Sequence, residues 1–182
     1  VSLATLTLSG FEALIRWYHP DKGIIAPAHF ISIAEETGLI VAIGQWALLT
    51  ACQQMAEWNR TLRHDPPLYV SVNISGKQFA DEDIALLVRR SLDQTQLAPE
   101  RLSLEITETA VLENKEAAIA ALNKLKELGV RFSLDDFGTG YSSFSYLHQL
   151  PYDTLKIDRS FITRVGPSGE NTEIIHAIIV LA

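Results

Sequence analysis

Acidic and amide side chains recur at the ends of short apolar segments spread along this 182-residue chain. The set consists of Glu12, Asn73, Glu105, Asp135 and Asp136. Carboxylate and amide oxygens are the ligands that Mg²⁺ and Mn²⁺ prefer, and a hard divalent cation neutralises carboxylates that would otherwise repel one another. The sequence therefore predicts a divalent-metal site. The adjacent pair Asp135 and Asp136 favours two ions, because one carboxylate can bridge two metals and hold a phosphodiester for attack by water.

Two cations accompany these acids in the same pattern. Lys156 comes late in an apolar segment, and Arg16 follows Glu12 by four residues. A lysine beside a metal-bound water favours hydroxide and stabilises the negative charge that develops on the phosphate. Each residue also has an ordinary structural explanation: an Asp-Asp pair is usually a turn or a helix cap, Glu105 and Glu108 could be exposed charges at a helix start, and Lys156 could be a salt-bridge partner. The prediction rests on the pattern that the residues share.

That shared pattern is a common strand phase. Five strands are predicted, at residues 9–17, 68–75, 102–107, 130–137 and 154–158. Alternate residues of a strand face opposite ways, and in the four later strands the serines, acids and lysine fall on one face while the aliphatic residues fall on the other. A parallel sheet with helices on both faces is apolar throughout, so a polar face favours a barrel with an enclosed interior. Functional side chains of such barrels lie at the carboxyl ends of the strands.

Helical patterns separate these strands, as βα units require. We expect helices at residues 27–37, with Gly38 as the stop, and from residue 41 to about residue 60. Further helices are expected at residues 81–94 and from an Asn114 cap to Gly129. Trp46 and Trp58 should lie in the core on the second of these helices.

Composition excludes several classes of protein. The formal charge of −7 argues against a coat for a nucleic-acid polymer and against a polybasic membrane surface. The single cysteine, Cys52, excludes an internal disulfide and is expected to be a small core residue. Apolar stretches are too short to predict membrane insertion, and a cytoplasmic location is expected, including the cytoplasmic part of a membrane-anchored parent.

Several motifs together resemble one known family. They are Glu12-Ala13-Leu14 with Arg16, Asn73-Ile74-Ser75, LEITE at residues 104–108, DDFGTGYSS at residues 135–143 and LKIDRSF at residues 155–161. This set strongly resembles the EAL-domain family of bacterial cyclic di-GMP phosphodiesterases, over almost the whole chain. The resemblance implies a modified TIM-like (β/α)₈ barrel that hydrolyses cyclic di-GMP to linear pGpG with Mg²⁺ or Mn²⁺.

Residue roles follow from this resemblance by position. Metal ligands are implied at Glu12, Asn73, Glu105 and Asp135, with Asp136 on a second metal. Lys156 matches the lysine that acts on the attacking water, and Glu108 matches a glutamate that steadies the loop at residues 135–141, which couples the site to dimerisation. Leu14 and Arg16 match substrate-contacting positions. With Glu12, Lys156 and Glu108 as the catalytic set, the resemblance implies a competent enzyme.

The resemblance also implies that residues 1–182 are a single partial EAL domain, truncated at both ends, within a parent that carries sensory or cyclase domains and forms homodimers. The first strand and the last two would lie outside the chain. A rival interpretation is a catalytically inactive cyclic di-GMP receptor or protein-interaction module. A metal-dependent barrel lyase acting on a carbonyl substrate is a third, which the strand pattern alone leaves open.

Overall fold

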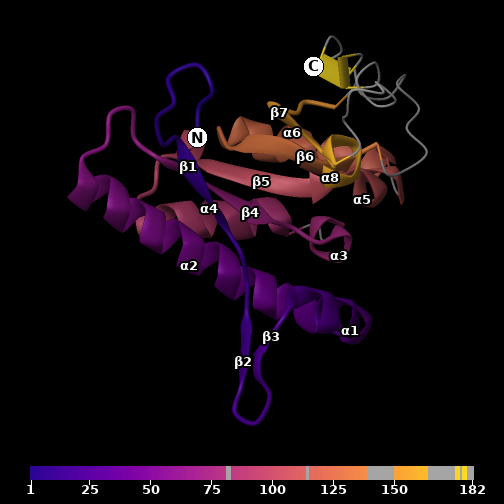
Figure 1. The fold of residues 1–182 in the computed structure, drawn as a ribbon. Coiled ribbons are helices and arrows are strands. Elements are labelled where there is room, and N and C mark those ends of the chain that lie inside the picture. Colours follow the sequence, from indigo (N-terminus) through magenta and orange to yellow (C-terminus); the bar gives the residue numbers. More distant parts are fainter. Residues whose placement is uncertain (81–82, 114, 139–149, 164–174, 177, 180–182) are drawn as a thin grey trace.

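The computed structural model describes residues 1–80, 83–113, 115–138, 150–163, 175–176 and 178–179. Its centre is a curled parallel sheet in which five strands lie in the order β1-β4-β5-β6-β7 (Figure 1). These strands are β1 (Gly10–Ala13), β4 (Tyr69–Asn73), β5 (Leu102–Thr107), β6 (Arg131–Phe137) and β7 (Thr154–Ile157). All five predicted strands are present, and the sheet is half of a barrel.

Helices connect the strands and occupy the four predicted stretches, together with further short helices that were not predicted. They are η1 (Pro27–His29), α1 (Ile31–Thr37), α2 (Leu39–Leu62), α3 (Gly76–Phe79), α4 (Ile84–Thr95), η2 (Pro99–Arg101), α5 (Glu108–Glu113), α6 (Lys115–Glu127) and α8 (Arg159–Ile162). Gly38 ends α1 with a φ of +78°, the left-handed cap that glycine adopts without a steric penalty. The predicted Asn114 cap lies outside the described residues.

The aliphatic face of the sheet forms the core. Val70, Val72, Leu104, Phe132 and Leu134 alternate with the polar residues of their strands and are almost fully buried beneath the helices. Helix α2 packs against β4 and α4 along this outer face (Figure 1). Burying this face fixes the strand phase, and the phase directs the polar residues to the concave side of the sheet.

An antiparallel hairpin that the sequence analysis missed extends away from the sheet (Figure 1). Its strands are β2 (Trp17–His19) and β3 (Gly23–Ile25). The first strand was predicted to run through residue 17, but β1 ends at Ala13, the last residue that pairs with β4. Gly23, at a φ of +70°, turns the chain so that β3 folds back on β2, and this local pairing replaces continued pairing with β4.

Helix α2 is long and apolar enough to meet the length and hydropathy criteria for a membrane span, and no other helix among the described residues does so. In the structure its buried side includes Cys52, as predicted, at 0% exposure. Trp58 is half-buried and packs on Phe11 with ring centroids 4.9 Å apart. The prediction for Trp46 was wrong, because this side chain is 60% exposed.

Candidate functional site

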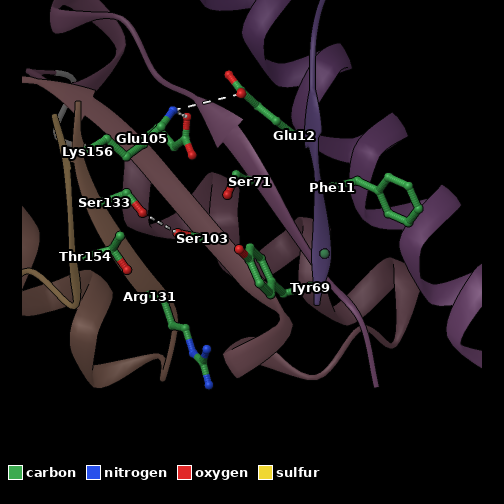
Figure 2. A pocket seen from close by; sticks show the side chains of 11 residues that line it. Phe11, Glu12, Tyr69, Ser71, Ser103, Glu105, Arg131, Ser133, Thr154 and Lys156 are labelled. Atoms are coloured by element: carbon green, nitrogen blue, oxygen red, sulfur yellow. Dashed lines mark hydrogen bonds and ion pairs between the residues drawn. The ribbon is translucent and has the colours of Figure 1, made fainter. Parts of the chain in front are cut away.

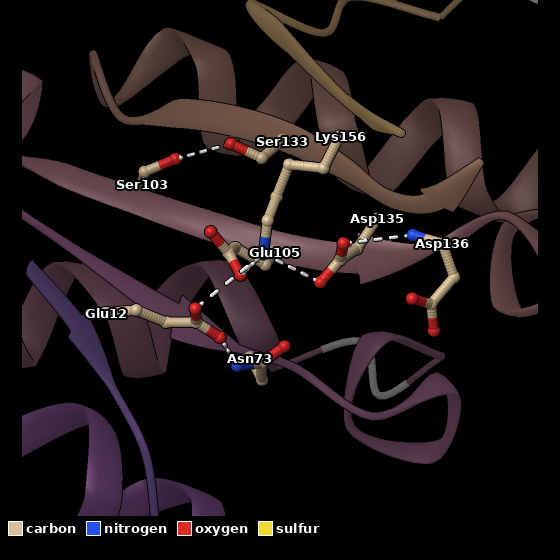
Figure 3. Close-up of polar contacts among 8 residues, drawn as sticks. All are labelled: Glu12, Asn73, Ser103, Glu105, Ser133, Asp135, Asp136 and Lys156. Atoms are coloured by element: carbon tan, nitrogen blue, oxygen red, sulfur yellow. Dashed lines mark hydrogen bonds and ion pairs between the residues drawn. The ribbon is translucent and has the colours of Figure 1, made fainter. Parts of the chain in front are cut away.

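The register of the sheet brings the predicted acids to one end of the concave face. Asn73 lies opposite Glu105 across β4 and β5, while Asp135 lies opposite Thr107 across β5 and β6. Glu12 pairs by backbone with Ser71, two residues before Asn73. Each strand is thus displaced along its neighbour, as in a sheet that curls toward a barrel. The long acidic side chains span this stagger and converge (Figure 3).

Lys156 lies at the centre of the convergence. Its ammonium donates to Glu105 Oε2 at 2.6 Å and to Asp135 Oδ2 at 2.9 Å, and its Nζ lies 3.9 Å from Glu12 Oε2 (Figure 3). Three strands therefore supply carboxylates to one cation from a fourth. The lysine is the salt-bridge partner of all three acids.

Asn73 joins the same cluster through Glu12. Its side-chain Nδ2 donates to Glu12 Oε1 at 3.0 Å. This bond links the exposed edge strand β1 to β4 at the level of the lysine, and it leaves the Asn73 amide oxygen on the same side as the carboxylates (Figure 3). Of the five predicted metal ligands, four belong to one connected set of contacts.

The fifth, Asp136, lies on a β-bulge. Leu134 pairs with Leu155 and Phe137 pairs with Ile157, so two residues of β6, Asp135 and Asp136, oppose the single residue Lys156 of β7. Asp136 has a φ of +53°, and its backbone N–H donates to Asp135 Oδ1 at 2.9 Å. The Asp136 carboxylate points away from Lys156 (Figure 3). The two adjacent acids therefore face different surroundings.

Glu108 is the first residue of α5 and is only 6% exposed. Its Oε2 accepts a hydrogen bond from the backbone N–H of Gly138 at 3.2 Å. The alternative that it is an exposed charge at a helix start is therefore wrong. Gly138 lies within the loop at residues 135–141 that Glu108 is expected to steady, and residues 139 to 141 lie outside the described part of the chain.

Leu14 and Arg16 lie at the rim, between β1 and the hairpin. Leu14 is 57% exposed, and the Arg16 guanidinium donates to the carbonyl of Ile15 at 2.7 Å. Neither belongs to the contact set around Lys156. A cavity of about 640 Å³ between α2 and the β1–β4 edge is lined by Leu14 and also by Glu12, Asn73 and Glu105, so Leu14 and these three residues share one recess.

Burial and charge shift the protonation of the cluster. Burial raises the pKa of Glu105, and the hydrogen bond from Lys156 opposes this rise. Burial also acts to lower the pKa of Lys156, but its bonds to Glu105 and Asp135 outweigh burial and hold that pKa above its usual range. Burial, and then the charges of Asp135 and Asp158, raise the pKa of Asp136. A cationic partner is therefore built into the acidic site.

The donor set fits a hard divalent cation by its chemistry. It offers carboxylates and one amide oxygen with no sulfur or imidazole, and the position among them already attracts a positive charge, that of Lys156. Within the described residues, however, no group of three or more Asp, Glu, His or Cys side chains is arranged closely enough to coordinate one ion. The carboxylates close around the ammonium instead.

A layer of serines lies beneath the acids, and the sequence pattern that places them on the polar face does not by itself assign them to the site. Ser103 and Ser133 share a buried hydrogen bond of 3.0 Å, and the Ser71 hydroxyl helps to lower the pKa of Glu105. With Thr154 they line a cavity of about 290 Å³ that also reaches Glu12, Glu105 and Lys156 (Figure 2). Period-two alternation was the signal that could have identified them.

Comparisons with known proteins agree with this geometry. The sequence profile of the EAL domain matches residues 1–182. The chain belongs to the EAL-domain family. It is 42% identical over 180 residues to the bifunctional diguanylate cyclase/cyclic di-GMP phosphodiesterase MucR of Pseudomonas aeruginosa, covering 94% of this chain and 25% of that protein.

Solved EAL structures share the fold. The PaMucR phosphodiesterase, solved in complex with c-di-GMP, superposes with a TM-score of 0.87 at 43% identity, covering 93% of this chain and 68% of that one. The EAL enzyme Bd1971, in its form with cAMP and cyclic di-GMP bound, gives a TM-score of 0.87 at 34% identity, covering 94% of this chain and 47% of that one. The half-barrel of this EAL domain thus corresponds to part of a TIM-like barrel. The chain spans only 20% to 29% of the length of the curated relatives it matches.

Proposed function

We propose that this EAL domain hydrolyses cyclic di-GMP to linear pGpG with Mg²⁺ or Mn²⁺, as the phosphodiesterase part of a longer protein. The observation that carries the proposal is the Lys156 ammonium held between Glu105 and Asp135, with Glu12 beside it. Family membership supports it, since MucR is named as a cyclic di-GMP phosphodiesterase and PaMucR was solved with c-di-GMP.

In this proposal Glu12, Asn73, Glu105, Asp135 and Asp136 hold one or two ions. When bound, such ions supply a nucleophilic hydroxide at neutral pH and neutralise the phosphoryl oxygens. Water attacks the phosphorus, the bond from phosphorus to the 3′ oxygen breaks, and the 3′ oxygen leaves with a proton. Of the protein groups, Lys156 stabilises the negative charge of the attacking oxygen and of the phosphate.

The rim residues bind the substrate in this proposal. Arg16 carries a guanidinium suited to a phosphate oxygen, and Leu14 offers an exposed apolar surface to a guanine base. Glu108 accepts a hydrogen bond from the backbone N–H of Gly138, two residues after Asp136. In this proposal it belongs to the catalytic set because it holds this backbone. Leu14 lines the recess that contains the acids, and Arg16 follows it by two residues in the chain.

The test follows pGpG release from cyclic di-GMP by the full-length protein in Mg²⁺, with Glu12→Ala as the disabled variant. We expect wild-type turnover and loss of about two orders of magnitude or more in the variant, which removes a proposed ligand that Asn73 also contacts. Tight binding of cyclic di-GMP without product would instead support the receptor interpretation. Turnover unaffected by Glu12→Ala would remove these residues from the mechanism.

We further propose a cytoplasmic location, sensory or cyclase domains elsewhere in the same protein, and homodimerisation. Coverage supports the further domains only, since the chain spans 25% of MucR, which is named as both cyclase and phosphodiesterase. Size-exclusion chromatography with light scattering on the full-length protein tests the dimer.

A further inference from the structure

Gly138, the residue that follows β6, is in close contact with an aromatic ring from α8. A Cβ added to Gly138 would lie 2.7 Å from Cε2 and 2.8 Å from Cζ of Phe161, closer than side chains tolerate. Gly138 also has a φ of +96°, in the region that favours glycine. The ring of Phe161 therefore rests against the backbone of Gly138, where any side chain would push it away.

Gly138 is held from a second side by Glu108, whose Oε2 accepts its backbone N–H at 3.2 Å. Phe137, the preceding residue, is 1% exposed and pairs with Ile157, and its carbonyl accepts the N–H of Asp158 at 3.5 Å. The chain is thus fixed immediately after the bulge by groups from α5, β7 and α8.

The conformation of the bulge must be held in place by contacts of the residues on either side of it. Asp136 occupies a left-handed conformation, which costs a residue with a side chain on the order of 1 kcal/mol or more and persists only where the surroundings determine it. The residues before the bulge are held by the ladder between Leu134 and Leu155. Those after it are held by the contacts of Phe137 and Gly138.

We infer that Phe161 is a positioning residue for the acid pair. By holding Gly138, its ring fixes the outgoing end of the bulge and so the directions in which Asp135 and Asp136 point. Phe161 follows Lys156 by five residues on the same β7–α8 segment. The contact therefore ties the segment that carries the lysine to the end of β6, the strand that carries the acids. This inference rests on the proposed function, in which those acids hold the metal.

The experiment compares Phe161→Leu with Ile162→Ala, a control on the same short helix whose side chain is 51% exposed. Two readouts are used on the full-length protein: Mn²⁺ affinity by titration calorimetry, and hydrogen exchange of residues 134–138 in chelator. We expect Phe161→Leu to weaken Mn²⁺ binding about tenfold, as loss of a group that orients ligands typically does. We also expect faster exchange in residues 134–138, and neither change in Ile162→Ala.

A double-mutant cycle with Gly138→Ala isolates the contact. In the wild type the new methyl group meets both the ring and the strained φ; in the Phe161→Leu background only the φ strain remains. Gly138→Ala should therefore weaken Mn²⁺ binding less in that background. Equal effects in both backgrounds, or Mn²⁺ affinity and exchange unchanged in Phe161→Leu, would overturn the inference.

If Phe161→Leu fails to fold, Phe161→Met takes its place in the same comparison, since the flexible methionine side chain fills irregular core space. Failure of the proposed function has a different signature, namely wild-type protein that binds Mn²⁺ and releases no pGpG. In that case the exchange and calorimetry comparisons still decide the role of Phe161.

Discussion

Lys156 Nζ lies 2.6 Å from Glu105 Oε2, and the glutamate side chain is only 4% exposed while that of the lysine is 32% exposed. The glutamate is therefore buried beneath the lysine. An acid in this position depends on its cation, because a buried carboxylate without a partner is costly. The pair links the middle strand of the sheet to its last strand.

Replacing Lys156 should lower the turnover number. Lys156→Met removes the charge that in the proposed mechanism stabilises the attacking oxygen, and we expect kcat for cyclic di-GMP to fall about 10²- to 10⁴-fold. Steady-state kinetics on the full-length protein measure this. Lys126→Met is the matched control, because Lys126 also forms a 2.6 Å ion pair, with Asp153, but away from the site. A variant with normal kcat would remove Lys156 from the reaction.

Neutralising the buried acid should weaken metal binding. Glu105→Gln keeps the shape of the side chain but removes a charge, and we expect Mn²⁺ affinity to fall at least about tenfold, with turnover lost in parallel. Chelation of the wild type should likewise stop turnover, and added Mg²⁺ should restore it. The control is Glu57→Gln, an exposed acid on α2. Unchanged Mn²⁺ binding by Glu105→Gln would contradict the proposed ligand set.

Because of Cys52, the folded state should become less stable as the pH rises into the alkaline range. Burial raises its pKa to about 12, whereas in the unfolded chain the thiol has a pKa of about 8.5. The contribution of the buried thiol to the free energy of unfolding is therefore complete below about pH 8.5. It is lost as the pH rises toward 12, because only the thiol of the unfolded chain ionises in that range.

Urea unfolding under reducing conditions measures this contribution. Between about pH 7 and pH 10, wild type should lose about 2 kcal/mol more stability than Cys52→Ala. Parallel pH profiles for the two proteins would contradict the burial of this thiol.

Gly44→Ala should destabilise the protein, although replacing glycine by alanine inside a helix usually stabilises it. Alanine in a helix interior is normally favoured over glycine by about 0.5–1 kcal/mol. Here the new Cβ would lie 1.7 Å from Nε2 of Gln78, whose amide packs against α2 and is the buried side-chain nitrogen without a hydrogen-bond partner among the described residues. We expect Gly44→Ala to cost about 1–3 kcal/mol.

The same substitution in a Gln78→Ala background tests the cause. With the amide gone, Gly44→Ala should become neutral or stabilising, as measured by thermal unfolding of both pairs. If the cost persisted, backbone packing and not Gln78 would be its source.

The sequence predicted the sheet and most of the site because both depend on the alternation of residues along strands. Glu12, Asn73, Glu105, Asp135 and Lys156 share a strand phase, and the phase determines which face they occupy. The helix ends at Gly38 and Gly129 were also predicted, since a glycine that follows an apolar helical pattern is a local signal for a left-handed cap.

What the sequence did not predict depends on pairing between distant segments. The bulge at Asp135 and Asp136 exists only relative to β7, and no residue type marks it in β6 alone. The contact of Phe161 with Gly138 likewise joins segments that local patterns cannot relate. Trp46 was wrongly predicted to be buried because an apolar helix of this length presents hydrophobic residues on several sides, and only packing decides which of them are covered.

The bulge makes one member of the acid pair an insertion in the ladder between β6 and β7. Deleting a single residue there would let β6 pair without interruption and relieve the left-handed conformation at position 136. Such a chain would gain regularity in the sheet and lose an acid opposite the lysine. At this position the regular pairing of the sheet and the proposed reaction require different sequences, so selection for a more stable sheet would act against the proposed reaction.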